Sequence, residues 1–264
     1  MTDSQQDSLQ EMIAELLDGW KDFVSGTGPN LVDWRGRSEA QVATIMTLTA
    51  HVHATAAILR PAIPDELTIA HMPLVRSIFE STITIAWCDE VADAAQSLVN
   101  ESARQRRALR SSLEKSRTMS EMADQISGTD WSSLPTSSSQ QARYIEQRCD
   151  DVALDGAYAF YRMLSGMSHV SIETIDAYLD AESFIPGEPL SVKSNPGPIS
   201  SSPAWSHLVA CCLVWSGMVV NYLDKTRSRR SQLRLVARAL GIRPELPVKY
   251  DAHRRGQQST KRQR

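Results

Sequence analysis

One stretch of the chain separates into two faces at helical spacing: Tyr158-Ala-Phe-Tyr161-Arg162-Met-Leu-Ser165-Gly-Met-Ser-His169. On a helix that advances about 100° per residue, Tyr158, Arg162, Ser165 and His169 share a stripe, with Tyr161 beside it. The apolar side chains of the stretch point the other way. We therefore predict an amphipathic helix here, as part of a longer one at residues 156–178. This is the one part of the chain that gathers Tyr, Arg, Ser and His together.

The same helical spacing continues on both sides of this stretch. Strand-type alternation is nearly absent, and segments rich in Gly, Pro or Ser separate the helical patterns. We expect helices at residues 8–24, 38–60, 65–92 with a bend near Pro73, 94–126, 140–149, 205–223 and 229–240. The pattern predicts an all-α fold, a multi-helix array with a helical domain over 1–225 and a basic C-terminal arm over 226–264.

Composition excludes a disordered chain. The 264 residues are 42% hydrophobic and 22% charged, which is ample for a packed core. The four cysteines lack zinc-site spacing, and two of them are adjacent in an apolar run, so we expect buried free thiols. The first residues show no basic region followed by an apolar core, so we expect no export and a cytoplasmic protein.

A charge-free apolar run at residues 204–223 has two interpretations. Its length and the basic residues that follow it fit a single membrane span, which makes a single-span membrane protein one alternative. His207, Ser216 and Asn221 within the run favour a buried core helix instead. We expect the core helix, and we do not expect a membrane as partner.

The end of the chain is strongly basic. Residues 225–264 hold 13 Lys and Arg against 2 Asp and Glu, whereas the whole chain has a net charge of −3. This asymmetry predicts RNA or another polyanion as a partner. Equally, the segment folds back on the acidic body or simply solvates the end. The cations of the predicted helix at 229–240 are the candidate nucleic-acid contacts: Arg229, Arg230, Arg234 and Arg238.

Arg76 and Glu80 lie one turn apart in a predicted helix that is apolar almost all round. A carboxylate in such surroundings must be paired, because an isolated buried charge costs several kcal/mol. A structural ion pair between the two residues is one interpretation. In the other, Glu80 reaches across to orient or polarise His169.

His169 is the best candidate for a general acid or base, since an unperturbed imidazole titrates near neutrality. Arg162 has the chemistry to hold a phosphate, with Tyr161, Ser165, Glu80 and Arg76 in support. A bland interpretation competes with this one: the stripe is solvent-exposed, or its small residues pack against a neighbouring helix.

Several other kinds of site are disfavoured. His51 and His53 are two residues apart on a predicted helix, so they point in roughly opposite directions and do not share a metal ion. The chain has no Gly-rich phosphate loop, H-E-x-x-H, G-x-S-x-G or EF-hand pattern. We expect no metal and no cofactor, and we disfavour an ATPase, a zinc hydrolase and an α/β-hydrolase.

The order Arg76-x3-Glu80, then Trp131, then Tyr161-x3-Ser165-x3-His169 resembles an uncharacterised all-helical bacterial and phage family, domain-of-unknown-function family 5677. The resemblance covers about residues 40–180. It implies an all-α fold and supplies no activity.

A more distant resemblance is to the HEPN (higher eukaryotes and prokaryotes nucleotide-binding) helical domains. Their motif is an Arg followed after four to six residues by a His, which Arg162 and His169 satisfy, although Met163 stands where a polar residue commonly follows the Arg. Many of these domains are metal-independent ribonucleases of toxins and antiphage systems, and their sites usually form across a homodimer.

Two main hypotheses follow. The leading one is an uncharacterised helical interaction module that engages nucleic acid or an acidic partner through the basic arm. The alternative is a HEPN-like, metal-independent endoribonuclease. There His169 would activate the ribose 2'-hydroxyl or protonate the leaving oxygen, while Arg162 stabilises the phosphate.

Overall fold

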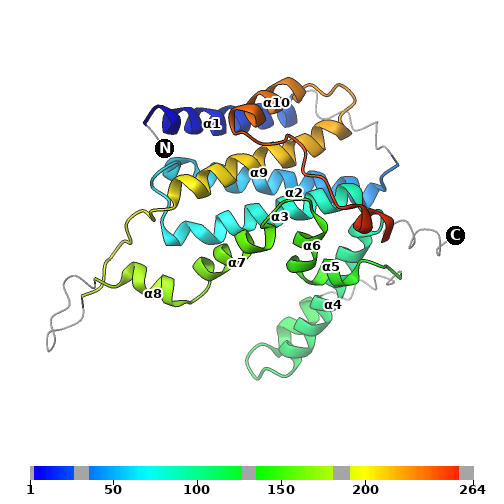
Figure 1. Ribbon diagram of the computed structural model, residues 1–264. Coiled ribbons are helices and arrows are strands. Elements are labelled where there is room, and N and C mark those ends of the chain that lie inside the picture. The colour runs from blue at the N-terminus through cyan, green and yellow to red at the C-terminus, as the bar shows by residue number, and fades with distance from the viewer. Residues whose placement is uncertain (1–2, 27–35, 127–134, 181–190, 256–264) are drawn as a thin grey trace.

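The computed structural model describes residues 3–26, 36–126, 135–180 and 191–255 (Figure 1). Within these ranges the chain is helical apart from turns, loops and two isolated β-bridges, so the predicted all-α fold is confirmed. The α-helices are α1 (Asp3–Ser25), α2 (Glu39–Leu59), α3 (Met72–Glu90), α4 (Ala94–Glu114), α5 (Ser139–Arg143), α6 (Ile145–Asp151), α7 (Ala157–Ser168), α8 (Ile172–Tyr178), α9 (Ser202–Leu223) and α10 (Arg230–Ala239). Short 3₁₀ turns lie at Arg60–Ala62, Ile69–His71 and Ser120–Gln125.

Helix α9 forms the centre of the array. Helices α1 and α10 pack against one side of it, and α2 and α3 pack against the other (Figure 1). Helix α3 also contacts α7 and α6. It therefore lies between the long helices α2 and α9 and the group of shorter helices at residues 139–178. The largest fully buried side chains, Trp87 and Phe79, both belong to α3.

Local sequence signals set the starts of α2 and α3. Ser38 and Gln41 form a capping box, in which each side chain satisfies the backbone N–H of the other. Helix α3 begins at Met72, later than the predicted start at residue 65, because Pro73 is favoured in a first turn and not in a helix interior. The expected bend near Pro73 is therefore the beginning of the helix.

The predicted helix at 156–178 is wrong in one respect, because it is two helices. Helix α7 ends at Ser168, and α8 begins at Ile172. Ser171 caps α8 by accepting a hydrogen bond from the Thr174 N–H at 3.3 Å, and a capping residue needs an extended backbone. His169 is extended as well, with φ −102° and ψ 168°, so it leaves the helical stripe of α7.

Two further predicted helices are also divided. The segment 94–126 is α4 followed by a 3₁₀ turn at Ser120–Gln125, and the segment 140–149 is α5 and α6 with a break at Tyr144. The loop residue Trp131 lies outside the described residues.

Among the residues that the structure describes, two helical segments, 39–62 and 202–223, are long and apolar enough to cross a membrane. In α9, 78% of the apolar window is buried by other helices, as in a core helix. All four cysteines are buried free thiols, as predicted. Burial raises the pKa of Cys88 and of Cys149 to about 12, which suits inert core residues.

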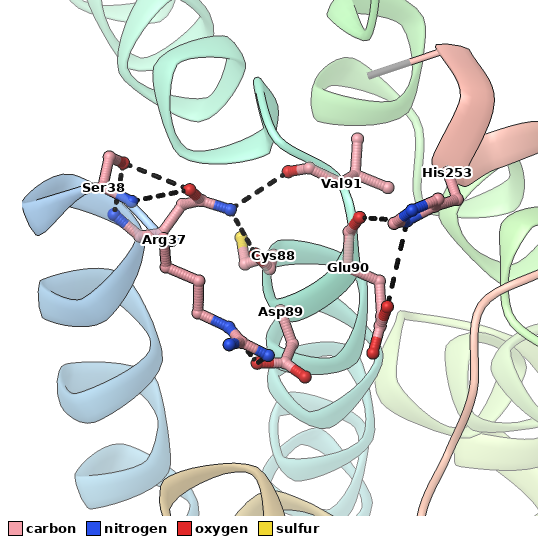
Figure 2. A network of polar contacts seen from close by, with 8 residues as sticks. Arg37, Ser38, Cys88, Asp89, Glu90, Val91 and His253 are labelled. Carbon is pink, nitrogen blue, oxygen red and sulfur yellow. Dashed lines mark hydrogen bonds and ion pairs between the residues drawn. The ribbon is translucent and has the colours of Figure 1, made fainter. Parts of the chain in front are cut away.

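The chain after α9 returns to the helical body. Helix α10 buries Leu233, Val236 and Ala237 against it, and residues 247–249 run beside residues 151–153 through an isolated bridge between Val152 and Val248. The His253 ring then lies 2.9 Å from the Glu90 carbonyl oxygen at the end of α3 (Figure 2). Residues 230–255 are thus an integral part of the packed structure.

Candidate functional site

Helix α3 presents Arg76 and Glu80 towards α7. The Arg76 Nε donates to Glu80 Oε1 at 2.8 Å, one turn along the helix. The two side chains are 21% and 33% exposed, so the pair lies at the edge of the core and remains accessible from outside. The predicted ion pair is therefore present, and it leaves the two terminal nitrogens of Arg76 for other partners.

Those two nitrogens meet α7 and the residue that follows it. Arg76 Nη2 donates to the Tyr161 hydroxyl at 3.2 Å, and Nη1 lies 2.6 Å from His169 Nε2. A guanidinium has no acceptor, so His169 Nε2 offers its lone pair in this contact. Residues 76 and 169, far apart in sequence, thus form one contact at the surface.

The break between α7 and α8 positions His169. Its backbone N–H donates to the Ser165 carbonyl at 3.2 Å, and its own carbonyl accepts from the Thr174 hydroxyl at 2.9 Å. Both backbone polar groups of His169 are therefore hydrogen-bonded. A continuous helix would have kept His169 on the stripe of Arg162 instead of turning it towards α3.

A small polar cavity of about 210 Å³ adjoins these contacts. Its lining residues come from α3 and α7: Pro73, Arg76, Ser77, Glu80 and Ser168. On the side of α2, His51 Nε2 lies 2.9 Å from the Ser77 hydroxyl. Sequence reasoning missed both His51 and Ser77 as members of this site, because nothing in a single helix predicts which residue of another helix it will meet.

The residues of this cluster lie within a segment that matches a known protein family. Residues 65–186 match a family of unknown function, DUF5677. The predicted resemblance to this family is confirmed, with the match beginning later than the predicted residue 40. Neither a curated protein nor a solved structure matches the chain. Similarity to HEPN domains stays a prediction.

The DUF5677 segment contains Arg76, Glu80, Tyr161 and His169. It also contains Arg162, but the Arg162 side chain does not join the other four in the structure. Arg162 is exposed, with its guanidinium carbon 6.0 Å from the centre of the Tyr158 ring. A side-chain hydrogen bond that Arg162 donates to Tyr158 raises the pKa of Arg162. Arg76 therefore occupies the position beside His169 that the sequence suggested for Arg162.

Two other predicted members contribute differently from expectation. Ser165 acts through its backbone carbonyl, which caps the end of α7 beneath His169. Glu80 contacts Arg76, and Arg76 contacts His169, so Glu80 orients the guanidinium rather than the imidazole.

The four candidate cations of the C-terminal segment have different surroundings. Arg229 is 7% exposed and donates through Nη2 to the Leu16 carbonyl at 3.0 Å. Burial lowers the pKa of Arg229 to about 10. Arg230 is half-buried, whereas Arg234 and Arg238 are exposed on the outer face of α10. Arg229 is therefore a core residue, and the surface charge of this helix comes from the other three.

No group of three or more His, Cys, Asp and Glu side chains within the described ranges could hold a metal ion. His51 and His53 lie on different sides of α2, as predicted, with His51 exposed and His53 buried.

A second polar cavity, of about 220 Å³, lies at the far end of α3. Figure 2 shows the polar contacts around it. Its charged groups are engaged in contacts that join chain segments. Arg37 Nε donates to Asp89 at 2.7 Å, and the Gln41 amide donates to the Cys88 carbonyl at 2.9 Å. These contacts tie the start of α2 to the end of α3, so we assign this cavity a structural role.

Proposed function

We propose that this protein is a metal-independent ribonuclease whose site is the cluster of Arg76, Glu80, Tyr161 and His169. The 2.6 Å contact between Arg76 Nη1 and His169 Nε2 carries the proposal. It places a group that binds phosphate oxygens beside a group that transfers protons, at an accessible position next to a polar cavity.

A phosphate group of RNA would replace this contact. Its oxygens would accept the N–H donors of Arg76 that now face His169 and Tyr161, while Glu80 keeps the guanidinium in place through Nε. His169 Nε2, a lone-pair acceptor in this geometry, would take the proton of the ribose 2'-hydroxyl. Arg76 would then stabilise the charge that develops on the phosphate in the transition state.

In this proposal the exposed cations of α10, which lies on the other side of α9 from the site, would contact a distant part of a long RNA substrate. Arg234 and Arg238 lie on the solvent side of the helix, where RNA phosphates can reach them. Arg234 is also 3.8 Å from Glu245, which weakens the field of this one residue.

The test is cleavage of a mixed RNA pool by purified full-length protein in EDTA. We expect the parent to cut, and we expect His169→Gln to lose activity by about 10²- to 10⁴-fold, the usual contribution of an acid–base group. Arg76→Lys keeps the charge but not the planar set of donors, so it should also lose activity. Arg162→Gln is the matched control, because the Arg162 guanidinium lies over the Tyr158 ring instead of beside His169, and it should keep nearly the parent rate.

The control also decides between two positions for the site. Loss of cleavage in Arg162→Gln with retention in Arg76→Lys would move the site to the HEPN-type motif of the sequence. Circular dichroism establishes that each variant is folded.

A helical interaction module is the second candidate. Exposed apolar side chains on and around α7 and α8 favour it, above all Met163, Val170 and Ile172, which are 56%, 95% and 63% exposed. A folded parent protein that leaves every RNA intact would overturn the ribonuclease and leave this function in its place.

A further inference from the structure

Two imidazoles flank the polar cavity beside Arg76. His169 follows Ser168, which lines one wall. His51 belongs to α2 and lies 2.9 Å from the hydroxyl of Ser77, which also lines the cavity. The proposed ribonuclease uses one of these rings, whereas cleavage of a phosphodiester by transfer to a neighbouring hydroxyl needs one group to remove a proton and another to supply one.

The contacts of the two rings differ in a way that assigns their roles. His169 Nε2 receives an N–H from Arg76 and so acts as an acceptor, which is the form of a general base. His51 Nε2 faces a hydroxyl, which can both donate and accept a hydrogen bond. A protonated His51 can therefore donate to Ser77 while Ser77 donates its own proton into the cavity.

The other proton carriers of the cavity are engaged. The Glu80 carboxylate accepts the Arg76 Nε at 2.8 Å, and the Ser168 hydroxyl donates to the Leu164 carbonyl at 2.6 Å. The Ser77 hydroxyl, in contrast, lines the cavity and lies 2.9 Å from the His51 imidazole.

We propose that Ser77, backed by His51, supplies the proton to the leaving oxygen of the RNA substrate. This inference rests on the proposed ribonuclease function. Ser77 is then a catalytic residue, and His51 acts through it as a positioning and proton-supplying residue.

The 2'-oxygen gives its proton to His169 Nε2 and forms a bond to phosphorus. The bond between phosphorus and the 5'-oxygen breaks, and that oxygen takes the Ser77 proton while Ser77 takes one from the His51 imidazolium. The products are a 2',3'-cyclic phosphate and a 5'-hydroxyl, and the two rings exchange protons with water to return to their starting forms.

The test compares two dinucleotide substrates with the full-length protein in EDTA. One has the ordinary 5'-oxygen at the scissile bond, and the other has a bridging 5'-sulfur. A thiolate leaves without a proton because a thiol is far more acidic than an alcohol. We expect Ser77→Ala and His51→Gln to lose about 10²- to 10⁴-fold in kcat on the oxygen substrate and to return close to the parent rate on the sulfur substrate.

Three comparisons make the result specific. His169→Gln should stay impaired on both substrates, because His169 removes the proton of the attacking 2'-hydroxyl and this transfer does not depend on the leaving group. The double variant Ser77→Ala/His51→Gln should be no slower than either single variant, since the two residues act as a unit. His71→Gln, a histidine substitution at the start of α3 outside the cavity lining, should keep the parent rate on both substrates.

The failures can be told apart. A parent that cleaves neither substrate overturns the ribonuclease and this inference with it. In the other failure the parent cleaves both substrates, while Ser77→Ala and His51→Gln either match the parent rate on both or are slowed by the same factor on both. That result overturns the proton-supply role alone.

Discussion

His53 shows how burial fixes the protonation of a single residue. Its ring stacks on Trp20 with centroids 4.5 Å apart, and its Nδ1 lies 2.9 Å from the Thr49 carbonyl oxygen. Burial is the main cause that lowers the pKa of His53 from 6.5 to about 3, and the charge of Arg229 adds to it. The hydrogen bond to Thr49 opposes this shift without reversing it.

We therefore expect His53 to make the folded protein less stable in acid. Between about pH 6.5 and pH 3 the unfolded chain binds a proton at this residue that the folded chain does not, so the free energy of unfolding falls as pH falls. The slope from this one group approaches about 1.4 kcal/mol per pH unit. Urea denaturation at pH 7, 6 and 5 measures it in the parent and in His53→Phe, which keeps the aromatic stack. Parallel stability curves for the two proteins would contradict the assignment.

The pair His51 and His53 also shows what residue spacing can predict. A separation of two residues on a helix correctly placed the rings on different sides of α2. It did not predict that His51 meets Ser77, because that contact depends on how α2 lies against α3.

At the scale of elements, helix α10 is amphipathic as predicted, and its apolar face is what attaches it. Leu233 is fully buried against the body, whereas Leu235, two residues later, is 62% exposed. Arg229 precedes the helix as its N-cap, and there its backbone turns the side chain into the core. Composition could not distinguish it from Arg234 and Arg238, which stay outside.

Leu233→Ala should consequently lower the free energy of unfolding by about 2–5 kcal/mol, the range for deleting a buried Leu side chain. Leu235→Ala is the control on the same helix, and its effect should stay within about 0.5 kcal/mol. Denaturant midpoints of the two variants provide the comparison. Equal effects would mean that α10 does not pack on the body as described.

The break between α7 and α8 is the element boundary that matters most for the site. The apolar periodicity of residues 156–178 continues through it, so periodicity alone predicts one helix. Ser171 followed by Thr174 is the local signal for a new helix start, and it competes successfully with propagation of α7. The position of His169 beside Arg76 depends on this competition.

For the whole molecule, the sequence singled out the residues that the structure brings together, but not which of them pair. Arg76, Glu80, Tyr161 and His169 were all candidates, and the DUF5677 segment contains them. Arg162 was paired with His169 because the two share a helical stripe, but packing of α3 against α7 brings Arg76 there instead. Such contacts between distant segments are set by the packing of whole helices.

An ion pair between Arg255 and Asp151 holds the C-terminal segment against the helical body. Asp151, at the end of α6, is buried and receives hydrogen bonds from the Trp87 ring N–H at 3.1 Å and from Arg255. Burial raises the pKa of Asp151, and Arg255 opposes this shift by favouring the charged carboxylate. The segment thereby joins α3, α6 and the residues around 255.

Arg255→Leu leaves that carboxylate buried without its cation, so we expect the free energy of unfolding at pH 7 to fall by about 1–3 kcal/mol. Arg254→Leu removes the same charge from an exposed neighbour and should change stability by less than about 0.5 kcal/mol. The loss of stability in Arg255→Leu should become smaller as pH is lowered, because a protonated Asp151 no longer needs a cation. Without Arg255, burial raises the pKa of Asp151 further above its value in the unfolded chain, so the folded variant takes up the proton first and gains stability in acid. Thermal and urea unfolding of the three proteins at pH 7 and pH 5 measure both effects. A deficit that is the same for the two leucine variants, or that grows in acid, would show that the contact between Arg255 and Asp151 does not hold the C-terminal segment in place.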